Sequence, residues 1–235
     1  MAVEVSRRRF TADEYQQMLR VGILRERDPF ELIDGEVVGK MTIGPRHSAV
    51  VDRLTQYFVL CAGAQAIVRA QGAVRLDTFN EPEPDVTLLR RRPDFYATAH
   101  PGPSDLLLVV EVAQSSIAYD RVTKAELYAR LGVVEYWLVD LNTDVITRYL
   151  EPLDGTYQKV ATATPDQPFA PALLPVCSVT TRDIRGCPGP TRTTSPARER
   201  AEAGPRCERR LRCRSRAYCA VVLAWSCWSF IIFTM

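Results

Sequence analysis

The stretch from Ser104 to Asp140 constrains the fold most, because it has the pattern of a strand, a helix and a second strand with short joints. Its first part, "SDLLLVVEV", is almost continuously apolar, as in strands that are buried on both faces of a mostly parallel sheet. "QSSIAYDRVTKAELYARLG" then fits a loop and a helix that stops at Gly132, and "VVEYWLVD" fits the second strand. Together they predict a βαβ unit, whose two strands lie parallel.

Several other segments predict the elements around this unit. Thr11 and Glu14 have the spacing of a capping box at the start of a short helix, and Asp34 and Gly35 lie between two apolar-rich arms, as in a tight hairpin. After Pro45, "RHSAVVDRLTQYF" has helical spacing. Strands are expected at "AIVRA", "AVRL" and "DVTLL", with "VITRY" as an antiparallel partner after "LNTD". The prediction is an α/β domain with a central mixed sheet flanked by helices and an N-terminal part that contains a β-hairpin.

Composition and charge divide the chain into two parts. With 235 residues, 46% hydrophobic and 25% charged, it fits one soluble domain, residues 1–185, with an appendage, residues 186–235. The appendage has nine Arg, no Lys and three Glu, so its net charge is 9 − 3 = +6. Because the net charge of the whole chain is +2, the domain has a net charge of 2 − 6 = −4. A mildly acidic domain is not a broad electrostatic binder of nucleic acid, so a basic surface must be local. Its best candidates are Arg90, Arg91 and Arg92.

The two ends of the chain bear on its location. The N-terminal "MAVEVSRRRF" has no apolar run of signal-peptide length, which predicts a cytoplasmic protein. The Arg- and Cys-rich tail ends in "YCAVVLAWSCWSFIIFTM", which is long enough to cross a bilayer and follows a basic segment, as in a tail anchor. The other interpretation is a disordered or non-native tail, because its Pro, Arg, Ser and Cys show no fold pattern. Its cysteines lack the CxxC spacing of a zinc site.

Glu111 is the one charged residue in the apolar run "LLLVVEV". A carboxylate that leaves water without a partner costs several kcal/mol or more, so a buried strand tolerates one mainly where a cation or a proton compensates it. Either Glu111 has such a partner or the strand ends there.

Two other residues have positions that could bring charged groups to the same site as Glu111. Pro82 and Pro84 exclude helical geometry before them, so "DVTLL" begins a strand with Asp85 at its mouth, although a Pro-Asp pair alone is more often a turn. Lys124 shares a helical stripe with Leu127, Tyr128 and Leu131, so it should face the sheet. The other interpretation of Lys124 is a surface lysine whose stem lies along the helix.

Asp85, Glu111 and Lys124 together suggest a metal-dependent site. Two carboxylates suit a hard cation such as Mg²⁺, which polarises a phosphoryl oxygen and acidifies a water. Lys124 would then orient the nucleophile or stabilise the developing charge. His47 lies on the buried stripe of its helix, where a histidine is more often a core residue than a ligand.

"PEPDV" and "VVEVAQSSIAYDRVTKAELYARLGVVEYWLVD" resemble the Uma2 or DUF820 family of the PD-(D/E)XK superfamily, and the resemblance runs from about Phe10 to about Ile184. It implies a restriction-endonuclease-like core in which Asp85 is the carboxylate of the PD motif and Glu111 the second acidic residue. Position 113 is Ala where the superfamily usually has Lys, and Lys124 is the relocated basic residue. Accessory positions implied by the resemblance are Glu31, Glu36, His47 and Tyr128.

The function that these observations predict is an endonuclease dependent on Mg²⁺ or Mn²⁺. It would hydrolyse phosphodiester bonds in nucleic acid, with DNA as the favoured substrate, and a homodimer is compatible with this function. The alternative is a nuclease-fold module that binds nucleic acid or a protein without cleavage.

Overall fold

The structure is a computed structural model that describes residues 7–25, 28–40, 43–163 and 167–185. The chain separates into two units, residues 1–188 and 189–235, and all the described residues belong to the first. The tail-anchor prediction falls on residues outside the described part. Among the described residues, no helix is long and apolar enough to span a membrane.

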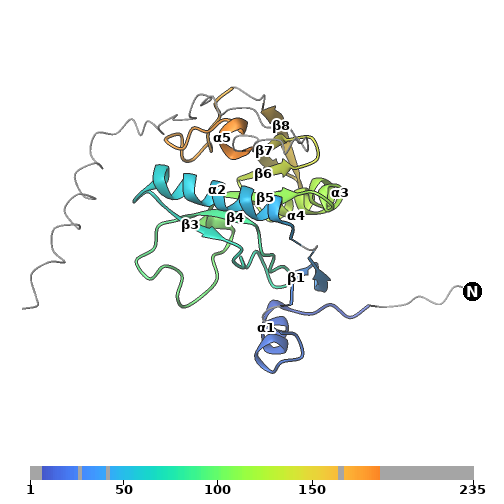
Figure 1. The fold of residues 1–235 in the computed structure, drawn as a ribbon. Coiled ribbons are helices and arrows are strands. Elements are labelled where there is room, and N and C mark those ends of the chain that lie inside the picture. The colour runs from blue at the N-terminus through green and yellow to red at the C-terminus, as the bar shows by residue number, and fades with distance from the viewer. Residues whose placement is uncertain (1–6, 26–27, 41–42, 164–166, 186–235) are drawn as a thin grey trace, which may run out of the picture. The chain divides into compact units, whose positions relative to one another are not determined.

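A six-stranded mixed sheet forms the centre of the described unit (Figure 1). Its order is β3-β4-β5-β6-β7-β8, and every neighbouring pair is antiparallel except β5 and β6, which are parallel. The predicted βαβ unit and mixed sheet are therefore confirmed. The strands are β3 (Ala66–Ala70), β4 (Val86–Arg90), β5 (Leu106–Ala113), β6 (Glu135–Asp140), β7 (Val145–Leu153) and β8 (Thr156–Ala163).

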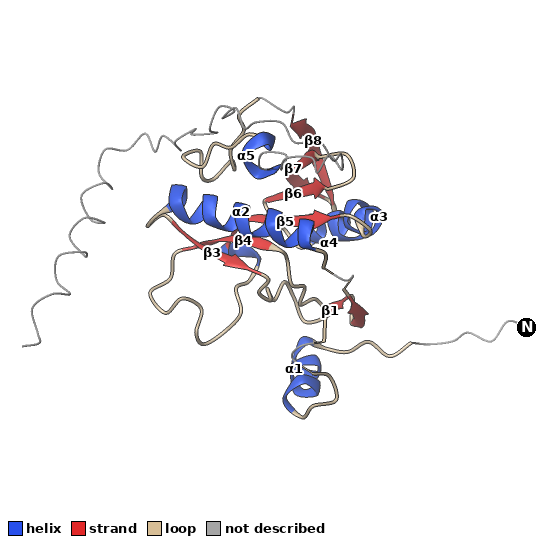
Figure 2. Ribbon diagram, viewed as in Figure 1, coloured by secondary structure: helices blue, strands red, loops and turns tan. Residues whose placement is uncertain are grey.

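Helices cover both faces of this sheet (Figure 2). On one face, the long helix α2 packs Leu54 and Phe58 against Val110 of β5. On the other face, Tyr128 packs against Val109 of β5. Burial by helices on both sides explains why β5 is apolar along its length, although only one of its neighbours is parallel. The helices are α1 (Ala12–Arg20), α2 (Pro45–Ala62), α3 (Ile117–Tyr119), a π-helical turn (Asp120–Lys124), α4 (Ala125–Arg130) and α5 (Thr181–Arg185), with a 3₁₀ turn at Pro103–Asp105.

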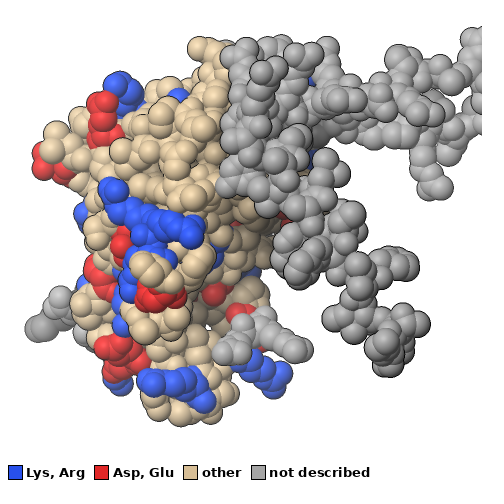
Figure 3. All heavy atoms as spheres, turned by 90° about the vertical axis from the view of Figure 1, so that its left-hand side faces the viewer, with Lys and Arg blue, Asp and Glu red and all other residues tan. Residues whose placement is uncertain are grey.

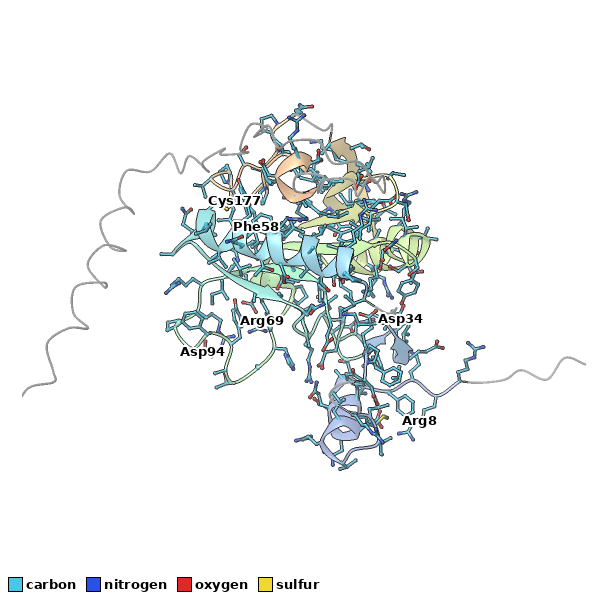
Figure 4. All side chains as sticks on the ribbon, viewed as in Figure 1. Arg8, Asp34, Phe58, Arg69, Asp94 and Cys177 are labelled. Carbon is cyan, nitrogen blue, oxygen red and sulfur yellow. The ribbon has the colours of Figure 1, made fainter. Side chains whose placement is uncertain are left out.

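The segment after β8 completes the core on the α2 face. Phe169 and Val179 form an antiparallel bridge, and Cys177 is fully buried in the cluster that contains Phe58 (Figure 4). The segment around Phe169 also packs its ring against Trp137 of β6, with ring centroids 4.8 Å apart. This part of the chain therefore belongs to the folded domain.

The N-terminal part contains the predicted capping box and hairpin. Strands β1 (Phe30–Ile33) and β2 (Glu36–Gly39) pair antiparallel around Asp34 and Gly35, both of which have positive φ. Leu32 of β1 exchanges two backbone hydrogen bonds with Glu81, at 2.8 and 3.2 Å. These bonds hold the hairpin against the segment that leads into β4.

Two details of the fold differ from the predictions. "AVRL", Ala73–Leu76, is not a strand; its amides donate to Pro82, Pro101 and Asn80 instead of to a neighbouring strand. Strand β8 was not predicted, although Asp154 and Gly155 form its hairpin turn with positive φ angles of 49° and 77°. An Asp-Gly pair between two runs that contain β-branched and aromatic residues was the signal for it.

Candidate active site

Lys124 is buried at the end of the π-helical turn, and its ammonium lies between two carboxylates. Its Nζ is 2.9 Å from Oε1 of Glu111 and 3.1 Å from Oε2 of Glu31, and the residue is 3% exposed. Tyr128 lies one turn further along the helix and donates its hydroxyl to the same Oε1 of Glu111 at 2.7 Å. The lysine thus faces the sheet, and the surface interpretation of Lys124 is wrong.

Asp85 precedes β4 and lies beside Glu111. The register pairs Val86 with Val110, so the next pair outward sets Asp85 opposite Glu111 on the same face of the sheet. Oδ2 of Asp85 accepts a hydrogen bond from the amide of Val112 at 2.8 Å. The two carboxylates come from neighbouring central strands, which gives them a fixed separation.

His47, near the start of α2, also reaches Asp85. Its Nε2 lies 3.1 Å from Oδ2 of Asp85, and the side chain is 13% exposed. The other ring nitrogen, Nδ1, is buried and has no hydrogen-bond partner among the described residues. His47 therefore orients the Asp85 carboxylate, and it is not only a core residue.

All of these side chains except that of Tyr128 line a single cavity. Its charged lining consists of four carboxylates and two ammonium groups, so its formal charge is −2 with His47 neutral. Two of these residues were not predicted: Asp120, which precedes Lys124 by one helical turn, and Lys40, whose Nζ donates to the carbonyl of Glu83 at 2.7 Å. The charged lining residues are Glu31, Asp85, Glu111, Asp120, Lys40 and Lys124.

Burial and charge set the protonation of this cluster. Burial raises the pKa of Glu111 to about 7 against the opposing effect of Lys124. Burial disfavours the charge on Lys124, but the carboxylates of Glu111 and Glu31 raise its pKa well above the usual value. For Asp85, burial is outweighed by the hydrogen bond from His47, and its pKa is lowered. Lys124 and Asp85 are therefore charged at neutral pH, and Glu111 keeps its proton to a higher pH than an ordinary glutamate does.

The structure does not bring every predicted residue to this cavity. Glu36 is exposed at the turn of the hairpin, where its carboxylate lies 3.6 Å from Arg7. Arg90 is at the far end of β4 from Asp85, about 17 Å away along the five-residue strand at about 3.3 Å per residue. Arg91 and Arg92 follow Arg90 directly in the chain, so they also lie beyond this end of β4.

The donor set of the cavity fits a hard cation with several waters. Oδ1 of Asp85 and Oε2 of Glu111 accept no hydrogen bond from the described residues, and neither is sealed from solvent. Mg²⁺ commonly binds one or two carboxylates and keeps several waters. No group of three or more His, Cys, Asp or Glu side chains in the described part of the chain has the geometry of a metal site. A cation here would therefore depend on two carboxylates, water and substrate oxygens.

The mixed sheet and its helices match the fold of a solved DUF820 structure. A crystal structure described as that of a "putative nuclease belonging to DUF820" from Anabaena variabilis matches with a TM-score of 0.60 and 18% sequence identity, over 75% of this chain and 97% of that one. The sequence model of the Uma2 family, described as "Putative restriction endonuclease", matches residues 12–182. The chain therefore belongs to the Uma2 family, as its motifs predicted. No curated protein matches it.

Proposed function

We propose that this protein is an endonuclease that hydrolyses phosphodiester bonds in DNA with Mg²⁺ or Mn²⁺. The observation that carries the proposal is the contact of the buried Lys124 ammonium with Glu111, beside Asp85, in one cavity. The family description of a restriction endonuclease supports DNA as the substrate.

The charge of the cavity supports a divalent cation. A phosphodiester is an anion, and a lining with a formal charge of −2 repels it. One divalent cation would neutralise that charge, so that a phosphate would no longer be repelled from the two carboxylates. When bound, the cation would polarise the phosphoryl oxygen and acidify a water. The free oxygens of Asp85 and Glu111 are the groups that would hold it.

Lys124 acts as a charged group in this proposal. Because Glu111 and Glu31 raise its pKa, the ammonium keeps its proton at neutral pH and does not serve as a general base. Two of its three N–H groups reach Glu111 and Glu31, which leaves one N–H for a water or a phosphate oxygen. Its role is to orient the nucleophile and to stabilise negative charge in the transition state.

Tyr128 and His47 position the carboxylates. The hydroxyl of Tyr128 fixes Oε1 of Glu111, so the other oxygen of Glu111 stays available. His47 and the amide of Val112 hold Oδ2 of Asp85 in the same way. Each carboxylate is thus oriented through one oxygen and offers the other.

A cleavage assay with charge-removing variants tests this function. Asp85→Asn and Glu111→Gln should abolish cleavage of plasmid DNA with Mg²⁺, and Lys124→Met should lower it by about a hundredfold or more. The matched controls are Glu151→Gln and Lys159→Met, which remove an exposed ion pair with an N–O distance of 2.6 Å on the β7–β8 hairpin. These two variants should cleave as the wild-type chain does.

The alternative function is binding without cleavage. The wild-type chain would then bind nucleic acid but show no metal-dependent cleavage of plasmid, single-stranded DNA or RNA. Retained cleavage by Asp85→Asn would also reject the proposed site.

A further inference from the structure

The loop after β4 has a fixed conformation, and its residues are not part of the cavity lining. Tyr96 is buried and donates its hydroxyl to the carbonyl of Arg90 at 2.7 Å. Arg92 forms a bidentate ion pair with Asp94, in which Nε lies 3.0 Å from Oδ1 and Nη2 lies 2.7 Å from Oδ2. Phe95 and Tyr96 both have positive φ, 50° and 61°, which costs free energy unless the surroundings hold them there. The loop is therefore held in place by its own contacts.

This fixed loop presents an aromatic ring to solvent among arginines. Phe95 is 56% exposed, and the guanidinium of Arg91 lies over its ring, 5.4 Å from the centroid. Arg69 of β3 donates from Nη2 to the carbonyl of Phe95 at 3.3 Å. Arg90 donates from Nε to the carbonyl of Ser104 at 2.9 Å. Figure 4 shows Arg69 and Asp94 close to each other, at the lower left of the view.

The positive charge of this surface is not neutralised. Arg69, Arg90 and Arg91 form no ion pair with a carboxylate in the described part of the chain, whereas Arg92 is paired with Asp94. Figure 3 faces this side and shows Lys and Arg side chains near its middle, with Asp and Glu side chains beside them. On a domain with a net charge of −4, such a cluster is a local attraction for an anion.

We propose that Arg69, Arg90, Arg91 and Phe95, here called the Phe95 patch, bind a single strand of nucleic acid outside the cavity. A base would stack on the exposed ring, and the guanidinium groups would contact the phosphates on either side. A polyanion fits this surface better than a protein partner does, because one ring offers little apolar area while three guanidinium groups lack a carboxylate. That the strand belongs to a cleavage substrate rests on the proposed function.

The position of the Phe95 patch would allow one strand of nucleic acid to contact both the patch and the cavity. Asp85 immediately precedes β4 and Arg90 is its last residue, so the two residues are about 17 Å apart along the chain. About five stacked nucleotides cover this distance at about 3.4 Å each. The patch would therefore hold an unpaired segment that flanks the scissile phosphate.

Binding without metal tests the patch independently of cleavage. Full-length chain in EDTA is titrated against a fluorescent single-stranded oligodeoxynucleotide of about 20 nucleotides, longer than a typical binding site, and against its blunt duplex. Phe95→Ala should weaken single-strand binding about tenfold, and Phe95→Trp should restore it because the ring still stacks. Arg91→Ala should reduce the slope of log K against log salt by about 0.7. Circular dichroism checks that each variant is folded.

Lys159→Ala is the matched control, because it removes an exposed cation from β8 at the other edge of the sheet. It should leave single-strand affinity unchanged. The proposal is overturned if Phe95→Ala binds the single strand within twofold of wild type, if Lys159→Ala loses as much affinity as Arg91→Ala, or if wild type binds no oligonucleotide. Asp85→Asn should keep single-strand binding, so a failure of cleavage and a failure of the patch give different results.

Discussion

The carboxylate of Glu111 is tolerated in a buried strand because Lys124 and Tyr128 both donate to it. Compensation is incomplete, since burial still raises the pKa of Glu111 to about 7 from an ordinary value of 4.5. In the absence of metal, the folded chain therefore holds a proton on Glu111 that the unfolded chain has already lost above pH 4.5. Glu111 thus lowers stability at neutral pH while it prepares the cavity for a cation.

This pKa difference predicts the pH dependence of a variant. Between pH 4.5 and about 7 the folded state binds the extra proton, so the free energy of unfolding of the wild-type chain falls as pH rises. Glu111→Gln removes the titrating group and keeps an acceptor for Lys124 and Tyr128. Urea denaturation in EDTA should show no gain below pH 4.5 and a gain that grows to about 3 kcal/mol above pH 7. A gain that is the same at every pH would contradict this account.

At the scale of elements, Glu135 joins the sheet to the segment after β8. It is 1% exposed, and its Oε1 accepts from Nε1 of Trp137 at 2.6 Å and from Nη2 of Arg148 at 2.9 Å. Its Oε2 accepts from the amide of Ala172 at 2.6 Å. Arg148 also donates to the carbonyl of Ala170 at 2.8 Å. One carboxylate thus satisfies donors from two strands and from the segment that covers them.

Loss of this carboxylate should destabilise the domain strongly. Glu135→Ala removes the carboxylate partner of Arg148, which keeps only the carbonyl of Ala170, and leaves the amide of Ala172 without its acceptor. Breaking such a buried pair costs about 3–5 kcal/mol. The control Glu151→Ala removes an exposed carboxylate from an ion pair and should cost about 1 kcal/mol or less. Urea denaturation of both variants measures the difference, and similar losses for the two would show that the Glu135 contacts contribute little.

Local patterns were enough to predict most elements. The βαβ unit, the capping box at Thr11 and the turn at Asp34 each depend on residues that are close in sequence, and the structure has all three. Lys124 facing the sheet also followed from helical spacing within one segment. The segment "AVRL" failed because a short apolar run does not reveal whether a neighbouring strand will accept its amides.

The completion of the cavity depends on contacts that no local pattern contains. Glu31 and Lys124 are 93 positions apart, and they meet because Leu32 and Glu81 pair the hairpin with the segment before β4. Lys40 enters the lining through the same hairpin. Only the family resemblance pointed to Glu31, and it pointed equally to Glu36, which lies elsewhere. Sequence spacing alone gave no means to separate them.

At the scale of the whole molecule, charge is distributed unevenly over an acidic domain. The cavity has a formal charge of −2, and the Phe95 patch outside the cavity has cations without carboxylate partners. A nucleic acid would be attracted to the patch and repelled from the cavity until a divalent cation is bound there. Nucleic-acid binding at the Phe95 patch should therefore not require a metal ion, whereas nucleic-acid binding at the cavity should.

A cation held by Asp85 and Glu111 should stabilise the entire domain, since the unfolded chain does not preserve the two-carboxylate site. At a Mg²⁺ concentration of about 100 times its dissociation constant, the gain is about 2.7 kcal/mol. The gain should shrink as pH falls below about 7, because Glu111 must lose its proton to bind metal. Thermal unfolding in EDTA and in MgCl₂ should show this shift for wild type and for Glu151→Gln, and no shift for Asp85→Asn or Glu111→Gln. Equal shifts in all four chains would place the cation outside this cavity.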